Sequence, residues 1–488
     1  MSVPKNSYIV GLYAKWEVLI PSLQHSLVED AIMEYQFEPL VRIGEKGIIE
    51  PLSAKSWKFS GDYKILRFKI DTSRRFSDGS NLCAIDFKRS WEEGLRMESK
   101  SANSSLADGL GNLKGYNRFK EKGEIEGIKV IGEDELELIF EKPVRIALVH
   151  LSGGRFSAYK KVNNRYIGTG PYVIDEKGDD VILTPNIYYR NERPKLSNVI
   201  IRVVSPDIAL EKLKSGEIDA YLFSERLNLL GCEEGKLNPI NCVNGQEASH
   251  VVINLNGLRG RFFSDSNHRL GFQSLIWKNI DLAKESFKGY GFIADPQSFL
   301  KFQAGRIADS EAEAIIRSGE KYINRFIKAT HKQPLYLVSS NCAWAWLADF
   351  LRKEGVKLTE NSNVNFTLKE DLDMYYKTFK PDIISLTASV ADGDPDGLYH
   401  LLGRNGAIFS PMMERKKVCD GMEKGRKILD PLMLPAHYKK VSEDILKEVP
   451  YVHLGYFVRR MAYNGNRLKY RGSLIGRNSL SIMSLEPR

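Results

Sequence analysis

The sequence predicts a mixed α/β protein of several lobes, and three observations support this fold class. The chain has 488 residues, enough for about three domains. Short strands alternate with amphipathic helices, and twice a strand, a helix and a second strand follow one another in the order of a parallel crossover. No low-complexity tract or short repeat is present, which excludes a solenoid.

Hydrophobic periodicity places the first elements. Between residues 63 and 70, apolar side chains alternate with Arg67 and Lys69, as in a strand with one buried face. Phe87, Trp91 and Leu95 are spaced by four residues and therefore share one face of a helix. We expect strands at Tyr8–Leu12, Tyr63–Ile70 and Leu136–Phe140 and a helix at Ile85–Arg96.

The middle of the chain contains the clearer crossover. Val199–Val204 predicts a strand, Ser205 is expected to cap the following helix, and Pro206 suits its first position. Gly216 marks the helix end, and Ile218–Phe223 is the returning strand. Later elements are expected at Pro334–Ser339 (strand), Trp344–Glu354 (helix), Val356–Leu358 (strand), Ala436–Leu446 (helix) and Tyr451–Val458 (strand).

Composition is that of a soluble globular protein, with 42% hydrophobic and 27% charged residues. The formal net charge is +9, but basic residues are interleaved with acidic ones and form no stripe or tail. A nucleic-acid partner is therefore not expected. No stretch reaches the eighteen or so apolar residues of a bilayer span.

The N-terminal residues bear on the compartment. The apolar stretch at 9–13 is too short for a signal-peptide core, and no small-residue cleavage site follows it. Two settings fit: a cytoplasmic protein, or a mature extracytoplasmic form beginning at an added methionine.

Neither an enzyme nor a cofactor site is predicted. No Gly-x-Ser-x-Gly elbow, phosphate loop or His-Glu-x-x-His is present, and the eight histidines are scattered. The five cysteines fit no zinc or redox spacing, which leaves open whether Cys232 and Cys242 pair in an oxidising compartment.

Five short motifs occur in order along the chain. They are 49–57 with Phe76-Ser-Asp-Gly-Ser80 and Ala84–Phe87; Gly168, Thr169, Gly170, Pro171 and Tyr172 with Asn186–Tyr189; Leu213–Asp219; Arg269–Trp277; and Lys380–Ile384 with Asp392–Gly397. Together they resemble the family-five extracellular solute-binding proteins, which include oligopeptide, dipeptide and nickel carriers. The fourth motif departs from the family pattern, because Gly271 and Leu275 replace alanines and Trp277 replaces an aspartate.

The resemblance implies a periplasmic-binding-protein-like α/β fold of type II, with two main lobes joined by a hinge and one inserted domain. Domain I would comprise 1–44, 156–255 and 456–488, domain II would be 45–155, and domain III would be 256–455. The implied protein is a monomer that traps a peptide or other small polar solute between domains I and III. It would deliver this solute to the permease of an ABC transporter from a periplasmic or extracytoplasmic location.

Candidate ligand contacts follow from the resemblance and from loops at strand ends. In peptide-binding relatives, an aspartate three residues before the Asp-Pro step anchors the ligand amine; here that position is Ala391, and Asp392 lies one residue closer. Asp392, Asp394 and Asp396 form either a cation site or a solvated turn. The other candidates are Tyr13, Lys15, Trp16, Trp344, Trp346 and His400, while the residues of the second motif are expected to be structural.

Two other functions fit the same fold. One is a cytoplasmic or chemosensory ligand-binding sensor, and the other is a chaperone-like binder of peptides. The genomic start codon and the upstream sequence would separate the sensor from the importer component, whereas the chaperone-like binder predicts broad affinity without lobe closure.

Overall fold

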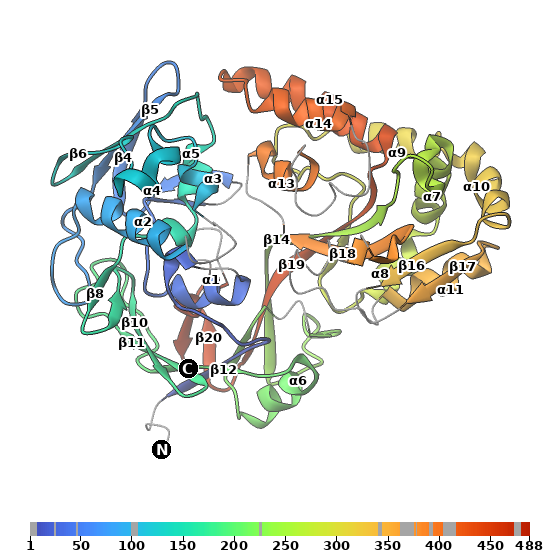
Figure 1. The fold of residues 1–488 in the computed structure, drawn as a ribbon. Coiled ribbons are helices and arrows are strands. Elements are labelled where there is room, and N and C mark those ends of the chain that lie inside the picture. The colour runs from blue at the N-terminus through green and yellow to red at the C-terminus, as the bar shows by residue number, and fades with distance from the viewer. Residues whose placement is uncertain are drawn as a thin grey trace. The chain divides into compact units, whose positions relative to one another are not determined.

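The computed structural model of the chain describes residues 7–23, 26–44, 47–98, 106–223, 227–339, 344–361, 375–376, 378–389, 394–403, 416–472 and 480–488. The chain forms two compact units: unit 1 is Met1–Gly245 with Arg460–Arg488, and unit 2 is Gln246–Arg459 (Figure 1). It passes from one unit to the other within two long strands, β14 (Ile240–Leu255) and β19 (Tyr451–Asn464). The finer division into three domains stays a prediction.

None of the described helices combines the length and the apolar character that crossing a bilayer requires.

The main sheet of unit 1 is mixed. Its strand order is β10-β11-β12-β1-β13-β19, and β1 pairs in parallel with both β12 and β13 while the other pairs are antiparallel. Every residue of the predicted strand at 8–12 lies in β1, which confirms that prediction. The strands are β1 (Tyr8–Leu12), β10 (Tyr172–Lys177), β11 (Asp180–Pro185), β12 (Val199–Val203) and β13 (Ala220–Leu222).

The predicted parallel crossover is confirmed. Helix α6 (Pro206–Ser215) connects β12 to β13, with Pro206 in its first turn and Gly216 in the left-handed conformation at its end (φ 78°). Ser205 occupies the N-cap position, but its side chain makes no capping hydrogen bond. The cap prediction was wrong in this respect: the Ser205 oxygen accepts no backbone N–H of the helix, and its hydroxyl donates to Asp207 Oδ2 at 3.4 Å.

A second sheet in unit 1 has the order β4-β5-β7-β6 and a hydrophobic core of its own with helix α2. As predicted, Phe87, Trp91 and Leu95 are buried in that core. The strand expected from residue 63 begins at 65 because Tyr63 has a positive φ (54°) within a turn. The bounds are β4 (Ala54–Phe59), β5 (Ile65–Ile70), β6 (Ile128–Gly132), β7 (Glu135–Ile139) and α2 (Ala84–Glu98).

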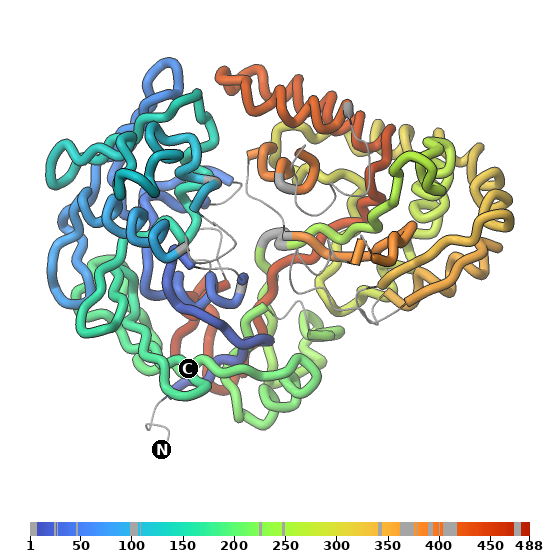
Figure 2. Tube along the Cα trace, in the orientation of Figure 1, coloured from blue at the N-terminus to red at the C-terminus, as the bar shows by residue number. Residues whose placement is uncertain are grey.

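The C-terminal segment returns to unit 1 and lies beside the N-terminal strand (Figure 2). Arg467 Nη2 donates to the carbonyl of Ser7 at 3.3 Å, and the backbone N–H of Ile482 donates to the hydroxyl of Tyr35 at 3.3 Å. The remaining elements of unit 1 are α1 (Leu27–Met33), α3 (Ala107–Leu110), α4 (Phe119–Lys122), α5 (Ala147–Leu151) and the strand pairs β2 (Val41–Ile43) with β3 (Ile49–Pro51), β8 (Lys160–Val162) with β9 (Arg165–Ile167), and β20 (Leu468–Tyr470) with β21 (Leu485–Pro487).

Unit 2 has the strand order β19-β14-β18-β16-β17, with β15 paired to β19. The second predicted crossover is confirmed, since β16 and β17 are parallel and α11 connects them. Strand β17 begins two residues later than expected, because Gly355 (φ 84°) and a hydrogen bond from Val356 N to Leu351 O at 2.9 Å hold the preceding residues in a turn. The strands are β15 (Phe292–Ala294), β16 (Leu335–Ser339), β17 (Leu358–Asn361) and β18 (Ile383–Ser389).

The helices of unit 2 include α14 and α15, which run side by side (Figure 1). The predicted helix at 436–446 lies wholly within α15, which buries an apolar face. Their bounds are α7 (Ser266–Lys278), α8 (Ile280–Ser286), α9 (Asp309–Arg317), α10 (Ile323–Thr330), α11 (Ala345–Lys353), α13 (Tyr399–Leu402), α14 (Lys416–Gly425) and α15 (Leu434–Glu448).

Candidate functional site

Three predicted ligand contacts follow β1 in unit 1. Trp16 is buried, and its indole N–H donates to Glu176 Oε2 at 3.3 Å. Lys15 is exposed and pairs with the carboxylate of Asp179 at 2.7 Å. Tyr13 is half-buried against the core of the unit. Both polar groups of Lys15 and Trp16 are thus engaged by the β10–β11 hairpin of the same unit.

The two predicted tryptophans of unit 2 differ in burial. Trp344 is 1% exposed and packs edge-on against Phe287, with 5.2 Å between ring centroids. Trp346 is half-buried, and its indole N–H finds no hydrogen-bond acceptor among the described residues. The Trp346 Nε1 atom is itself inaccessible to solvent, and the role of either tryptophan as a ligand contact stays a prediction.

The aspartate-rich motif is described in part. Asp396 is 5% exposed and accepts hydrogen bonds from Arg426, with Nε to Oδ1 at 2.9 Å and Nη2 to Oδ2 at 3.0 Å. Asp394 Oδ1 accepts the backbone N–H of Asp396 at 2.9 Å and caps a short 3-10 turn. The Asp396 carboxylate is thus already paired with a guanidinium, and its role as a cation ligand stays a prediction. Asp392 and the side chain of His400 lie outside the described residues.

Within the described ranges, no cluster of three or more His, Cys, Asp or Glu side chains is arranged to hold a metal ion.

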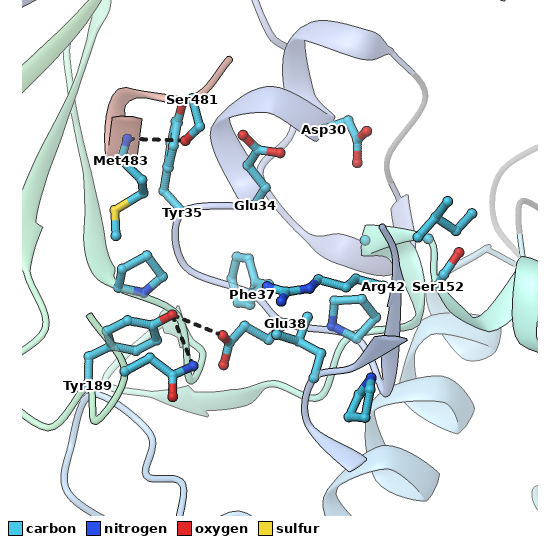
Figure 3. A pocket seen from close by; sticks show the side chains of 18 of the residues that line it. Asp30, Glu34, Tyr35, Phe37, Glu38, Arg42, Ser152, Tyr189, Ser481 and Met483 are labelled. Carbon is cyan, nitrogen blue, oxygen red and sulfur yellow. Dashed lines mark hydrogen bonds between the residues drawn. The ribbon is translucent and has the colours of Figure 1, made fainter. Parts of the chain in front are cut away.

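A cavity of about 640 Å³ lies within unit 1, and Figure 3 shows it from close by. Glu38, 5% exposed, is held there by Arg74 Nη1 at 2.7 Å, by the hydroxyl of Thr169 at 2.9 Å and by the hydroxyl of Tyr189 at 3.4 Å. Burial and the nearby Glu38 carboxylate raise the pKa of Tyr189, so that its hydroxyl stays protonated and donates. Other lining residues include Asp30, Glu34, Tyr35, Phe37, Arg42, Ser152, Ser481 and Met483.

The second sequence motif contributes directly to this region. Gly170 N donates to Gln36 O and Tyr172 N donates to Tyr35 O, both at 2.8 Å, which fixes the motif against the segment before Glu38. Its residues tie two distant segments together and so have the structural contacts expected of them. Sequence reasoning missed Glu38 and Arg74, which lie 36 residues apart and belong to no local pattern.

The third motif has an equally specific contact. Asp219 is 2% exposed, its Oδ2 accepts the backbone N–H of Ile9 at 2.7 Å, and Arg467 Nε lies 2.8 Å from its Oδ1. Burial raises the pKa of Asp219, although Ile9 and Arg467 act in the opposite direction. This carboxylate therefore links the first strand of the chain to its C-terminal segment.

Cys232 and Cys242 are neighbouring free thiols in unit 1. The hydrogen bond from Cys232 lowers the pKa of Cys242, and the positive charge of Arg460 acts in the same direction. The sequence leaves open whether Cys232 and Cys242 pair, and in the structure they are two adjacent free thiols. Because its pKa is lowered, Cys242 is the better nucleophile of the two.

The chain forms two α/β units joined through two long strands, and similar solved structures identify the fold class to which this arrangement belongs. The chain is similar over 99% of its length to DppA from Helicobacter pylori in complex with the peptide STSA, with a TM-score of 0.77, 18% identity and 98% of that chain covered. It is also similar over 99% of its length to NikZ from Campylobacter jejuni in complex with Ni(L-His), with a TM-score of 0.75, 18% identity and all of that chain covered. The fold is that of the type II periplasmic binding proteins.

The family follows from the sequence match. Residues 49–296 match the model of the bacterial extracellular solute-binding proteins, family 5 Middle, and the chain belongs to this family. It is 28% identical over 209 residues to the dipeptide-binding protein DppE of Bacillus subtilis (strain 168), a stretch that spans 38% of this chain and 38% of that protein. The match thus covers about two fifths of that relative's length.

Proposed function

We propose that this protein is the solute-binding component of an ABC importer, which captures a small polar solute outside the cytoplasm and delivers it to a membrane permease. The family match over residues 49–296 carries this proposal. The protein acts as a monomeric binding protein without catalytic activity, because a binding component holds its cargo unchanged while another subunit hydrolyses ATP.

The mechanism is closure about a hinge. The polypeptide changes unit only twice, within β14 and β19. A hinge needs only a few residues that absorb the change in backbone dihedrals, and these two crossings can supply them. A solute that contacts both units stabilises the closed state by its differential affinity for the two states. In this mechanism the solute binds between domains I and III, and Trp344 and Trp346 are candidate contacts with it.

Ligand binding is expected to compact the protein. In small-angle X-ray scattering, addition of the solute is expected to lower the radius of gyration. In a thermal melt it is expected to raise Tm by several degrees, because a ligand at about 100 times its Kd stabilises the native state by about 2.7 kcal/mol. A solute that raises Tm without changing the radius of gyration would contradict closure while leaving solute binding intact.

The class of cargo is a peptide or another solute with an amino group. DppE is described as a dipeptide-binding protein, and DppA is described in complex with the peptide STSA, which supports a ligand with a free amine. Asp392, one residue from the family's amine-anchor position, supplies the carboxylate in this proposal, because a buried ammonium requires a paired charge.

The substitution Asp392→Ala is expected to weaken binding of a peptide by at least about tenfold, since removing one partner of a desolvated charge pair costs about 2–5 kcal/mol. Isothermal titration calorimetry with the wild type measures this difference. The control is Asp281→Ala, which removes an exposed carboxylate on α8 that pairs with Lys284. Equal affinities of the Asp392 and Asp281 variants would remove Asp392 from the site.

A further inference from the structure

Two adjoining cavities in unit 1, distinct from the one around Glu38, share a lining rich in arginine. The smaller has a volume of about 80 Å³ and the larger about 490 Å³, and both are formed by the loops around Arg75 and around residues 187–193. Arg75 and Arg190 line both cavities, Arg74 lines the smaller and Arg193 the larger. Four guanidinium groups thus surround one region of the surface.

Two of these guanidinium groups have buried donors without acceptors. The Nε atoms of Arg74 and Arg75 are both inaccessible to solvent, and neither has a hydrogen-bond partner among the described residues. An unsatisfied buried donor costs about 1–3 kcal/mol, more when it is charged. Both residues line the smaller cavity, so an acceptor group bound there compensates this cost once the guanidinium groups turn to expose their Nε atoms.

The charges at this place are not balanced. Arg74 has a counter-ion, because its Nη1 lies 2.7 Å from Glu38 Oε2. For Arg75, Arg190 and Arg193, no described carboxylate lies within ion-pair distance, and the larger cavity has no acidic residue in its lining. Asp71, in the lining of the smaller cavity, pairs with Lys55 at 3.3 Å, and its Oδ2 lies 3.8 Å from Arg74 Nε, beyond hydrogen-bond distance. The site therefore carries an excess of about three positive charges.

The walls of the site are fixed by packing. The Tyr188 ring covers the turn at Phe76–Ser80, so closely that a Cβ added to Gly79 would lie 2.9 Å from its Cζ. Asp78 accepts the backbone N–H of Ser80 at 2.9 Å and holds this turn. The arginines thus extend from a preformed surface, which lowers the entropy lost when a ligand binds.

From the buried unpaired donors and the unbalanced charge, we infer that these cavities form a binding site for a phosphate-class oxyanion. A tetrahedral dianion fits the charge excess better than a single carboxylate does, and planar guanidinium groups bind phosphate oxygens in bidentate fashion. The smaller cavity holds the oxyanion, and the larger one leaves room for the rest of a phosphate ester. This site is independent of the proposed capture of a solute.

The test uses the full-length protein and inorganic phosphate at low ionic strength. Isothermal titration calorimetry is expected to detect binding that Arg75→Gln and Arg190→Gln each weaken by about tenfold. The control is Arg259→Gln in unit 2, which removes the same charge from an exposed arginine and leaves the affinity unchanged. Circular dichroism establishes that each variant is folded, and the exposed Arg190 provides a variant that does not disturb the core.

Co-sedimentation with vesicles distinguishes the source of the oxyanion. Binding to phosphatidylglycerol vesicles that Arg75→Gln abolishes, with none to phosphatidylcholine vesicles, assigns the site to anionic lipid headgroups. Phosphate binding without vesicle binding assigns it to a free anion. The inference is overturned if phosphate at millimolar concentration does not bind, or if the Arg75 and Arg190 variants bind it as tightly as the Arg259 variant.

Discussion

Replacement of Gly168 by alanine is expected to destabilise the protein by about 3 kcal/mol, because no space exists for the added methyl group. An ideal Cβ at this position would lie 2.1 Å from Gln36 O and 2.9 Å from Gln36 C, which are backbone atoms. Neither can turn aside as the end of a side chain would. The hydrogen bond from Gly170 N to Gln36 O holds the two segments at this separation.

Urea unfolding of Gly168→Ala and of the wild type measures the effect as a shift of the midpoint at unchanged slope. Gly132→Ala is the matched control, because no heavy atom lies within 4 Å of the Cβ that it would introduce. This control is expected to change the free energy of unfolding by no more than about 0.5 kcal/mol. Equal stability of the two variants would show that the Gly168 contact relaxes without cost.

Acidification is expected to destabilise unit 2 through His453. This side chain is 3% exposed, and burial lowers its pKa from 6.5 to about 3. Its Nδ1 lies 2.7 Å from the carbonyl of Asp295 and donates to it, so the neutral ring accepts at Nε2 from His250 Nδ1 at 3.0 Å. A proton on Nε2 would remove that acceptor and place a charge in the core.

The direction of this pH effect follows from the pKa values of His453 in the unfolded and in the folded chain. His453 of the unfolded chain takes up a proton as the pH falls below 6.5, whereas His453 of the folded chain stays neutral down to about pH 3. The contribution of His453 to stability is therefore full above pH 6.5 and is lost as the pH falls from 6.5 towards 3. At pH 5 the expected loss is about 2 kcal/mol. Denaturant unfolding at pH 7 and pH 5 measures it.

His453→Gln removes this titrating group and is expected to flatten the pH dependence of the unfolding free energy between pH 7 and pH 5. His331→Gln is the control, since His331 is exposed and its Nε2 donates to the carbonyl of Gly355 at 3.0 Å. An unchanged pH dependence in the His453 variant would assign the acid sensitivity to other groups.

Local patterns predicted the elements well because their causes are local. The apolar spacing of Phe87, Trp91 and Leu95 suffices to place a buried helix face, and Gly216 suffices to end α6. Ser205 shows the limit of such reasoning: its position is that of a cap, but its side chain accepts no backbone N–H of the helix and donates to Asp207 instead.

The sequence could not predict the partners of the candidate site residues, because these partners are distant along the chain. Asp396 was recognised as a candidate ligand, but its partner Arg426 lies 30 residues further on and no pattern connects the two. The contact of Asp219 with Ile9 spans 210 residues. The family motifs marked positions such as Asp219 correctly, while the reason for each became visible only where the chain brings its partner close.

Native mass spectrometry of the freshly purified protein tests the proposed function most directly. The account predicts a complex of one small solute per chain. A fraction of the protein is expected to keep its solute through purification and to release it on denaturation. Incubation of the stripped protein with pools of short peptides, sugars and metal chelates is expected to restore a single adduct. A chain that carries no solute and binds none from any pool would contradict the assignment as a solute-binding protein.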